Sequence, residues 1–433
     1  MGKVSQLYKN HDSRKKLFIL LICLGIYKLG MHIHVPFINR DALSAFGQGE
    51  GMFGMLNTFT GGALSTFSIF AVGIMPYITA SIIVQLLQMD LVPKVSEWKA
   101  QGEYGERKIK QLTYGLSVIF ALLQSIALTL SFNQIYSGMV MGGKFSYVLI
   151  TLVLTLGTII LIILGEVIEH KGIGKGISII ILAGILMTLP DTFGYFLNAE
   201  FTGNEAVFAI LKTALIILFV YALLLSIIVV NGGERKVPIQ DSNVGKYGVA
   251  SRKINYLPIK LNSAGVIPVI FASAMFMMPS TLLQFFGETK ISGFINTYIS
   301  FNSIIGIVFY GGIIVMFTFF YSFVQVDPIK LADNLNKQNQ FIPGVRPGGN
   351  TAEYFSRLLV RLTFVGAFFL AIVAVLPMIV GLATTIPQEL TMIGTSLIII
   401  VSVVIDMKEE LDVELTKSTY ERFKSNKKKT LWG

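Results

Sequence analysis

Long apolar runs alternate with short polar segments along the 433 residues of the chain. An apolar run of about 20 residues is long enough to cross a bilayer as a helix. The pattern predicts ten membrane-spanning helices, at Leu17–Val35, Ile74–Met89, Leu112–Phe132, Tyr147–Val167, Ile177–Leu197, Val207–Val230, Ala264–Phe286, Ile304–Val326, Leu358–Val380 and Thr391–Ile405. The predicted fold class is therefore an all-α membrane protein with ten transmembrane helices.

The stretch Met55–Met89 is apolar throughout but is interrupted by Gly61-Gly62 and by Gly73-Ile74-Met75-Pro76. Adjacent glycines disfavour helix, whereas proline suits the first turn of one. We therefore expect a short helical piece, a break, and a full helix from about Ile74. Irregular backbone at membrane depth is tolerated where protein buries it or where it lines a wet cavity, so the break indicates a pathway through the bilayer. An ordinary membrane helix preceded by an apolar extracellular loop fits the pattern equally well.

The sequence Gly73–Ile78 (GIMPYI) is echoed by Gly265–Ile270 (GVIPVI) five predicted spans later. The two copies would run in opposite directions across the membrane, as in an inverted repeat. This predicts two halves, residues 1–200 and residues 201–433, with the second and seventh spans facing each other. Chance similarity is the competing explanation, because glycine, proline and isoleucine are common in such sequences.

Charge fixes the expected orientation. Charged residues make up only 14% of the chain, against about 25% in soluble domains. With the N-terminus inside, 30 of the 35 lysines and arginines fall in cytoplasmic segments, as positive-inside topology requires. Both termini are therefore predicted to be cytoplasmic. Two of these segments, about 231–262 and 325–356, are longer than simple connections and are rich in turn residues. We expect them to dock an anionic or acidic partner, although a solvated topology anchor also explains their charge.

Residues suited to catalysis or metal binding are sparse. Cys23 is the only cysteine, which excludes disulfides, and the four histidines are scattered. No paired carboxylates, activated nucleophile or cofactor loop occurs within a span, so we expect no enzyme activity, cofactor or metal site. A secondary transporter for a small solute is disfavoured by the lack of intramembrane charge, and a membrane-embedded enzyme is a weaker rival. A sterically gated apolar path would suit a substrate of variable sequence, such as a polypeptide.

Four longer motifs carry a family resemblance: Gly61–Leu87, Gly172–Ile185, Leu257–Ser273 and Ala332–Tyr354. They resemble the SecY family, the central subunits of bacterial protein-conducting channels, and the similarity runs from the first span through the tenth. The resemblance implies a channel with an hourglass pore that translocates unfolded secretory polypeptides. It also implies release of apolar segments sideways into the lipid of the bacterial plasma membrane. Implied partners are SecE, SecG, the SecA motor, the ribosome, signal peptides and nascent chains.

The resemblance also implies roles for particular residues. A plug helix at about 58–70 would seal the outer funnel, with Gly61, Gly62, Ala63, Leu64, Ser65, Thr66 and Phe67. A pore ring would comprise Ile74, Ile78, Ile177, Ile181, Ile270 and Ile399. Polar positions at a lateral gate between the second and seventh spans would be Thr79, Gln85 and Ser273. Docking of SecA or the ribosome would use Arg346, Arg252 and Lys253.

The chain departs from the family pattern in two places. Bacterial relatives often carry a basic residue where this chain has Thr66, and the segment 240–250 is less basic than usual. An accessory SecY paralogue therefore remains an alternative to the housekeeping channel.

Overall fold

The computed structural model describes residues 11–39, 52–88, 92–135, 138–203, 206–241, 255–283, 293, 297–298, 300–301, 303–383 and 391–431. The helices in the first half of the chain are α2 (His11–Gly30), α4 (Met52–Phe59), α5 (Met75–Leu86), α6 (Pro93–Ala100), α7 (Glu103–Ile135), α8 (Lys144–Lys171) and α9 (Gly176–Gly203). Those that follow are α10 (Ala206–Asn231), α11 (Ile267–Leu283), α13 (Ile304–Gln325), α14 (Pro328–Lys337), α15 (Gly349–Ala383) and α17 (Ile393–Leu431).

Each predicted span overlaps one of these helices. Within the described residues, six helical stretches are long and apolar enough to cross a membrane, namely 103–133, 144–171, 176–194, 210–231, 304–337 and 349–382. The apolar helices α5 and α11 are shorter. The all-α membrane fold is thus confirmed, whereas the count of ten spans stays a prediction.

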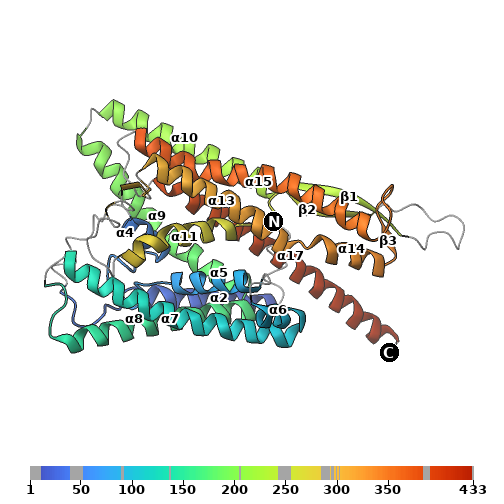
Figure 1. The fold of residues 1–433 in the computed structure, drawn as a ribbon, viewed down its shortest axis with the longest axis horizontal. Coiled ribbons are helices and arrows are strands. Elements are labelled where there is room, and N and C mark those ends of the chain that lie inside the picture. The colour runs from blue at the N-terminus through green and yellow to red at the C-terminus, as the bar shows by residue number, and fades with distance from the viewer. Residues whose placement is uncertain are drawn as a thin grey trace, which may run out of the picture.

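The helices form two groups, as Figure 1 shows. Helices α2, α5, α7 and α8 lie on one side, and α10, α11, α13 and α15 lie on the other, with α9 running between them. Across the boundary α5 contacts α11, so the predicted meeting of the second and seventh spans is confirmed. The division into inverted repeats at residue 200 stays a prediction.

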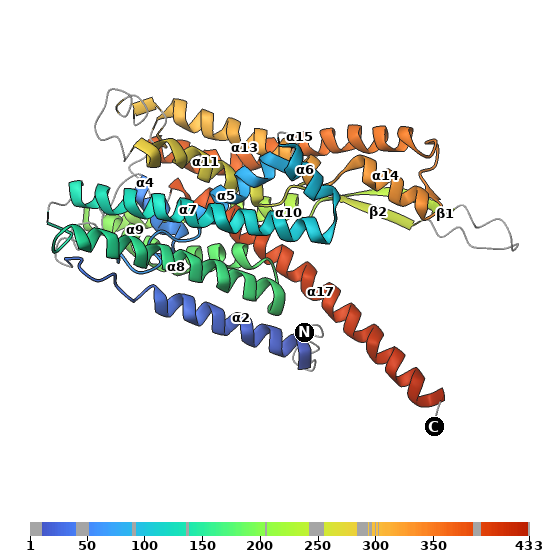
Figure 2. The ribbon, with the colours of Figure 1, turned by 60° about the horizontal axis from the view of Figure 1, so that its bottom comes forward.

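One end of the molecule carries α6, α14 and a small sheet, and α17 extends from the bundle at that end (Figures 1 and 2). The sheet comprises β1 (Glu234–Asp241), β2 (Asn255–Lys260) and β3 (Gln340–Phe341) in the order β2-β1-β3, with both pairings antiparallel. The sheet therefore joins the two long segments predicted to be cytoplasmic. Sequence analysis did not predict these strands.

A compact apolar cluster beneath the sheet holds it against α14 and α15. Val237, Ile239 and Ile259 pack there with Leu335 of α14 and Phe355 of α15, and all five side chains are buried. Helix α14 begins at Pro328, where the Asp327 side chain accepts hydrogen bonds from the N–H groups of Ile329 and Lys330. Asp327 is thus the N-cap of α14, and Pro328 occupies its first turn. The described parts of the two long segments thus form one folded unit.

Candidate functional site

The segment between α4 and α5, residues 60–74, forms consecutive turns. Helix α4 ends at Phe59, and Gly61 and Gly62 follow with φ angles of +71° and +87°. Those angles lie in the left-handed region, which glycine enters without a steric penalty. The plug helix expected at about 58–70 is therefore wrong as a secondary-structure prediction. The predicted break is confirmed, since α5 begins at Met75 with Pro76 in its first turn.

Hydrogen bonds fasten segment 60–74 to the chain that follows α2. The N–H of Val35 donates to the carbonyl of Phe67 over 3.1 Å, and the N–H of Ile69 donates to the carbonyl of Ile33 over 3.0 Å. The Thr66 hydroxyl donates to the carbonyl of Met31 over 3.3 Å. A threonine thus makes backbone contacts at the position where the family pattern often has a basic residue.

Glycines on the surrounding helices let the segment approach closely. A methyl group on Gly157 of α8 would overlap the carbonyl oxygen of Ile69, and one on Gly30 of α2 would overlap the Phe70 ring. A methyl group on Gly61 would lie 2.8 Å from Cα of Gly184 on α9. The segment therefore rests directly on three helices.

The seven residues predicted for the plug all lie in this segment. The side chains of Ala63, Leu64 and Phe67 are buried. The N–H of Ser65 donates to the Asn57 side chain, and the Ser65 hydroxyl donates to the carbonyl of Gly62. These contacts give the segment a defined structure without a helix.

The six isoleucines predicted for the pore ring belong to one continuous apolar cluster at the centre of the molecule. Ile177 is half-buried against it, and the other five are buried, namely Ile74, Ile78, Ile181, Ile270 and Ile399. They come from α5, α9, α11, α17 and the residue preceding α5. Elements from both helix groups therefore contribute them to the same interior region.

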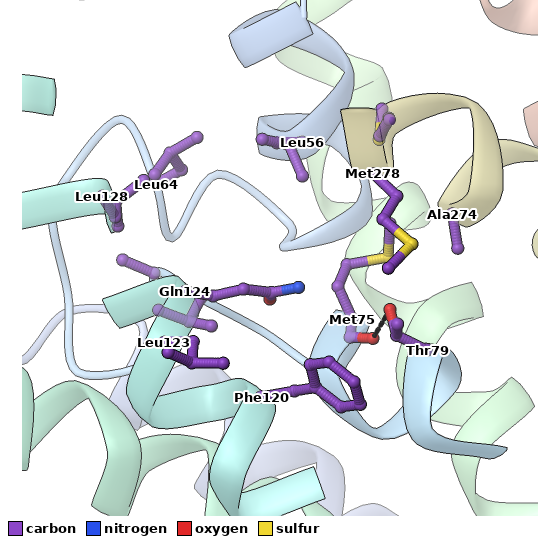
Figure 3. Close-up of a pocket in the computed structure, with 13 residues that line it drawn as sticks. Leu56, Leu64, Met75, Thr79, Phe120, Leu123, Gln124, Leu128, Ala274 and Met278 are labelled. Atoms are coloured by element: carbon purple, nitrogen blue, oxygen red, sulfur yellow. Dashed lines mark hydrogen bonds between the residues drawn. The ribbon is translucent and has the colours of Figure 1, made fainter. Parts of the chain in front are cut away.

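A cavity of about 90 Å³ lies where α5, α7 and α11 meet segment 60–74. Its wall includes Met75 and Thr79 of α5, Met277 and Met278 of α11, and Leu64 of the segment. Figure 3 shows the Gln124 side chain of α7 pointing toward Met75 and Met278. Methionine adapts its shape to different apolar neighbours, so these walls suit occupants of varied shape.

Sequence analysis missed most of this cavity wall. Met277, Met278 and Phe120 look like ordinary membrane-helix residues, and only tertiary packing brings them together. Gln124 offered one usable signal, because it is a polar residue in the middle of the apolar run Leu112–Phe132.

The three polar residues predicted at the gate have different surroundings. Thr79 lines the cavity, and its hydroxyl donates to the carbonyl of Met75 over 3.0 Å. The Ser273 hydroxyl lies 3.0 Å from the Tyr310 hydroxyl of α13. The Gln85 amide donates to Ser81, while its buried Oε1 has no hydrogen-bond partner among the residues that the structure describes. Among the three, Thr79 is the one that lines the cavity.

Of the residues predicted for docking, the structure describes Arg346, which lies at the end that carries the sheet. Arg346 is exposed between β3 and α15, where its carbonyl accepts a hydrogen bond from the Thr351 hydroxyl over 3.0 Å. Arg252 and Lys253 lie outside the described residues. Within the described part of the chain, no group of three or more histidine, cysteine, aspartate or glutamate residues could hold a metal ion.

The comparisons with known proteins fit this arrangement. The family model described as SecY matches residues 68–408. The protein translocase subunit SecY of Bacillus subtilis is 42% identical over 428 residues, covering 98% of this chain and 99% of that protein. The chain belongs to the SecY family. This membership makes it a protein-conducting channel subunit.

Solved structures share the fold of this SecY-family chain. One, described as showing that the plug domain of SecY stabilises the closed translocation channel and maintains a membrane seal, is 20% identical with a TM-score of 0.65. The alignment covers 93% of this chain and 92% of that one. Another, Sec61 in a canine ribosome–channel complex from the endoplasmic reticulum, is 21% identical with a TM-score of 0.62 and the same coverage.

Proposed function

We propose that the chain conducts unfolded polypeptides out of the cytoplasm between its two helix groups and releases apolar segments into lipid between α5 and α11. The observation that best supports this proposal is the cavity shared by α5, α7, α11 and segment 60–74. Every element that would have to move during opening borders that one space. Separation of α5 from α11 would open the cavity laterally and uncover the segment at the same time.

Segment 60–74 is the proposed plug. Its buried side chains and its hydrogen bonds to residues 31–35 would keep it within the first helix group when the channel is closed. The backbone hydrogen bonds within the segment close single turns and do not form a helix, so the segment could shift without the unfolding of a helix. The plug described for a structurally similar SecY protein fits this role.

The isoleucine positions are proposed as the constriction. Isoleucine is stiff because it branches at Cβ, and an apolar constriction can exclude water and ions by dewetting. Such a constriction has no charged group to select one polypeptide sequence over another. Thr79, Gln85 and Ser273 would weaken the apolar contact between the moving helices, with Thr79 having the most direct position.

Partners are proposed for the end that carries the sheet, which would face the cytoplasm together with both termini. SecA or the ribosome would dock on the folded unit of β1, β2, β3 and α14, with Arg346, Arg252 and Lys253 as contacts. SecE and SecG would complete the complex in the bacterial plasma membrane. The energy for transport would come from SecA or translation, so this chain would not act as an enzyme.

The path can be tested by disulfide crosslinking in a Cys23→Ala background. A secretory protein with one engineered cysteine is stalled in transit, and cysteines are placed at Ile78, at Ile270, or at the exposed control position Leu156 on α8. We expect crosslinks at Ile78 and Ile270 but not at Leu156. Crosslinking at none of the ring positions, in membranes shown to export the substrate, would contradict the proposed path.

A further inference from the structure

Residues 406–414 of α17 carry an unusual charge for this chain. They contain five acidic residues and one lysine, whereas the whole chain has a net charge of +10. The carboxylates of Asp406, Glu409 and Glu414 form ion pairs, and each pair leads to a different part of the fold. This acidic segment lies where α17 leaves the bundle at the sheet-bearing end (Figure 2). It therefore connects several elements at that end of the molecule.

On one side, buried hydrogen bonds fix α17 to the group of α10, α11, α13 and α15. Asn231 at the end of α10 donates to the Ser402 hydroxyl over 2.9 Å, and Asn262 donates to Asn231 over 2.9 Å. All three side chains are buried. Lys260 of β2 adds an ion pair with Glu409 at 2.6 Å. The acidic segment is therefore held firmly to this helix group and to the sheet.

On the other side, ion pairs join the acidic segment to the group of α2, α5, α7 and α8. Lys16 of α2 lies 2.7 Å from Glu414, and the two side chains are 34% and 30% exposed. Lys175, in the short connection from α8 to α9, lies 3.8 Å from Asp406. Ion pairs that water reaches are weak, and they can break without leaving a buried charge uncompensated. This side of α17 is therefore the one that can detach.

These two ion pairs lie at the opposite end of the molecule from the connection between the helix groups. Helix α9 leads into α10 at the end away from the sheet, as Figure 1 shows. The polypeptide joins the groups at that end, and the contacts of α17 with Lys16 and Lys175 join them at the other. Separation of the groups at the sheet-bearing end would have to lengthen or break both ion pairs.

We propose that residues 406–414 act as an electrostatic clasp that holds the two helix groups together in the closed channel. The inference rests on the proposed function, because it takes opening to be a separation of these groups. Partly exposed ion pairs are individually weak, so a docking partner or an entering polypeptide can open a clasp that consists of two of them. Because Lys260 of β2 pairs with Glu409, a shift of the sheet on docking would also move the acidic segment.

The test exchanges the charges of the Lys16–Glu414 pair in the complex purified from its own membranes. Lys16→Glu and Glu414→Lys each place like charges opposite one another. Each should therefore raise the ion conductance of the resting channel in a planar bilayer about threefold. The double variant restores an attractive pair with reversed polarity. Its resting conductance should return to that of the unmodified channel.

Arg107→Glu is the matched control for Lys16→Glu, because the charge change is identical. Arg107 pairs with Glu103 within α7, and their side chains are 75% and 85% exposed. This variant should leave the resting conductance unchanged. The double variant also lacks the positive charge before the first span, so an effect of Lys16→Glu on membrane orientation would not be reversed in it.

Unchanged conductance in both single variants, or an additive increase in the double variant, would overturn the clasp even if every variant exports polypeptide. Failure of the unmodified complex to export a secretory polypeptide would instead overturn the proposed function and the inference with it. Measuring export and resting conductance on the same preparations therefore separates the two failures.

Discussion

The chain segments that begin α5 and α11 have similar sequences but different surroundings. In both, glycine precedes proline by three residues, and Gly73 and Gly265 have almost the same φ, +65° and +67°. A methyl group added to Gly73 would lie 2.7 Å from Cγ2 of Thr60, whereas no atom of the described residues lies within 4 Å of one added to Gly265. The local backbone repeats, but the packing around it does not.

The difference shows what the repeated motif determines. Glycine in the left-handed region followed by proline stops one segment and starts the next helix, so each copy sets its own helix start. The residues that surround each copy of the motif depend on the chain segment that precedes it. Before α5 that chain is segment 60–74, which folds back against residues 31–35, whereas α11 follows β2 after a short connection. The proposed plug, segment 60–74, precedes only one of the two motif copies. The difference between the two halves that we propose for gating therefore lies outside the repeated motif.

The largest expected effect comes from separating segment 60–74 from α8. In Gly157→Ala the new methyl group would overlap the Ile69 carbonyl, and backbone cannot yield as easily as a flexible side chain. We expect a loss of about 3 kcal/mol in the free energy of unfolding. Thermal unfolding of the purified protein in detergent measures this loss.

Gly115→Ala in α7 is the control, because the added methyl group has no neighbour within 4 Å in the part of the chain that the structure describes. It should be neutral or stabilising by up to about 1 kcal/mol, since alanine favours helix over glycine. Equal stability of the two variants would mean that the segment does not pack on α8 as described.

The next effect compares the two motif glycines directly. Gly73→Ala and Gly265→Ala should each cost about 1 kcal/mol, because an L-residue is strained in the left-handed region. Gly73→Ala should lose about 1 kcal/mol more through its contact with Thr60.

Thr60→Ser removes the crowding methyl group and can keep the hydroxyl that donates to the Asn57 carbonyl. In that background the two glycine substitutions should have equal effects on the melting temperature. A difference that persists would place its origin elsewhere than at Thr60.

Sequence reasoning succeeded where the structure depends on neighbouring residues. Apolar run length located a helix at every predicted span, and Gly73 with Pro76 located the start of α5. It failed for segment 60–74, because the hydrogen bonds that hold this apolar stretch in turns come from Ile33 and Val35, about 30 residues earlier. A helix was the reasonable local expectation for those residues.

The sheet and the candidate site could not be predicted from the sequence for similar reasons. Pro238 and Pro258 argue against strands, and they fit only because β2 is an edge strand and β1 pairs with β3 beyond Pro238, at Gln240 and Asp241. The six isoleucines could be assigned by family resemblance, but each alone resembles ordinary core packing. The cavity beside α5 combines three helices, and no local pattern predicts which of their side chains meet there.

The smallest expected effect again uses the repeat. Ser81 and Ser273 each lie eight residues after the motif glycine. Ser273→Ala should cost about 1 kcal/mol, because the fully buried Tyr310 hydroxyl loses its hydrogen bond. Ser81→Ala should cost only about 0.3 kcal/mol, since the half-buried serine bonds to Gln85 within its own helix.

Adding Tyr310→Phe to Ser273→Ala should restore most of the melting temperature, because no buried hydroxyl then lacks a partner. An additive loss in the double variant would show that the hydroxyl pair does not couple α11 to α13.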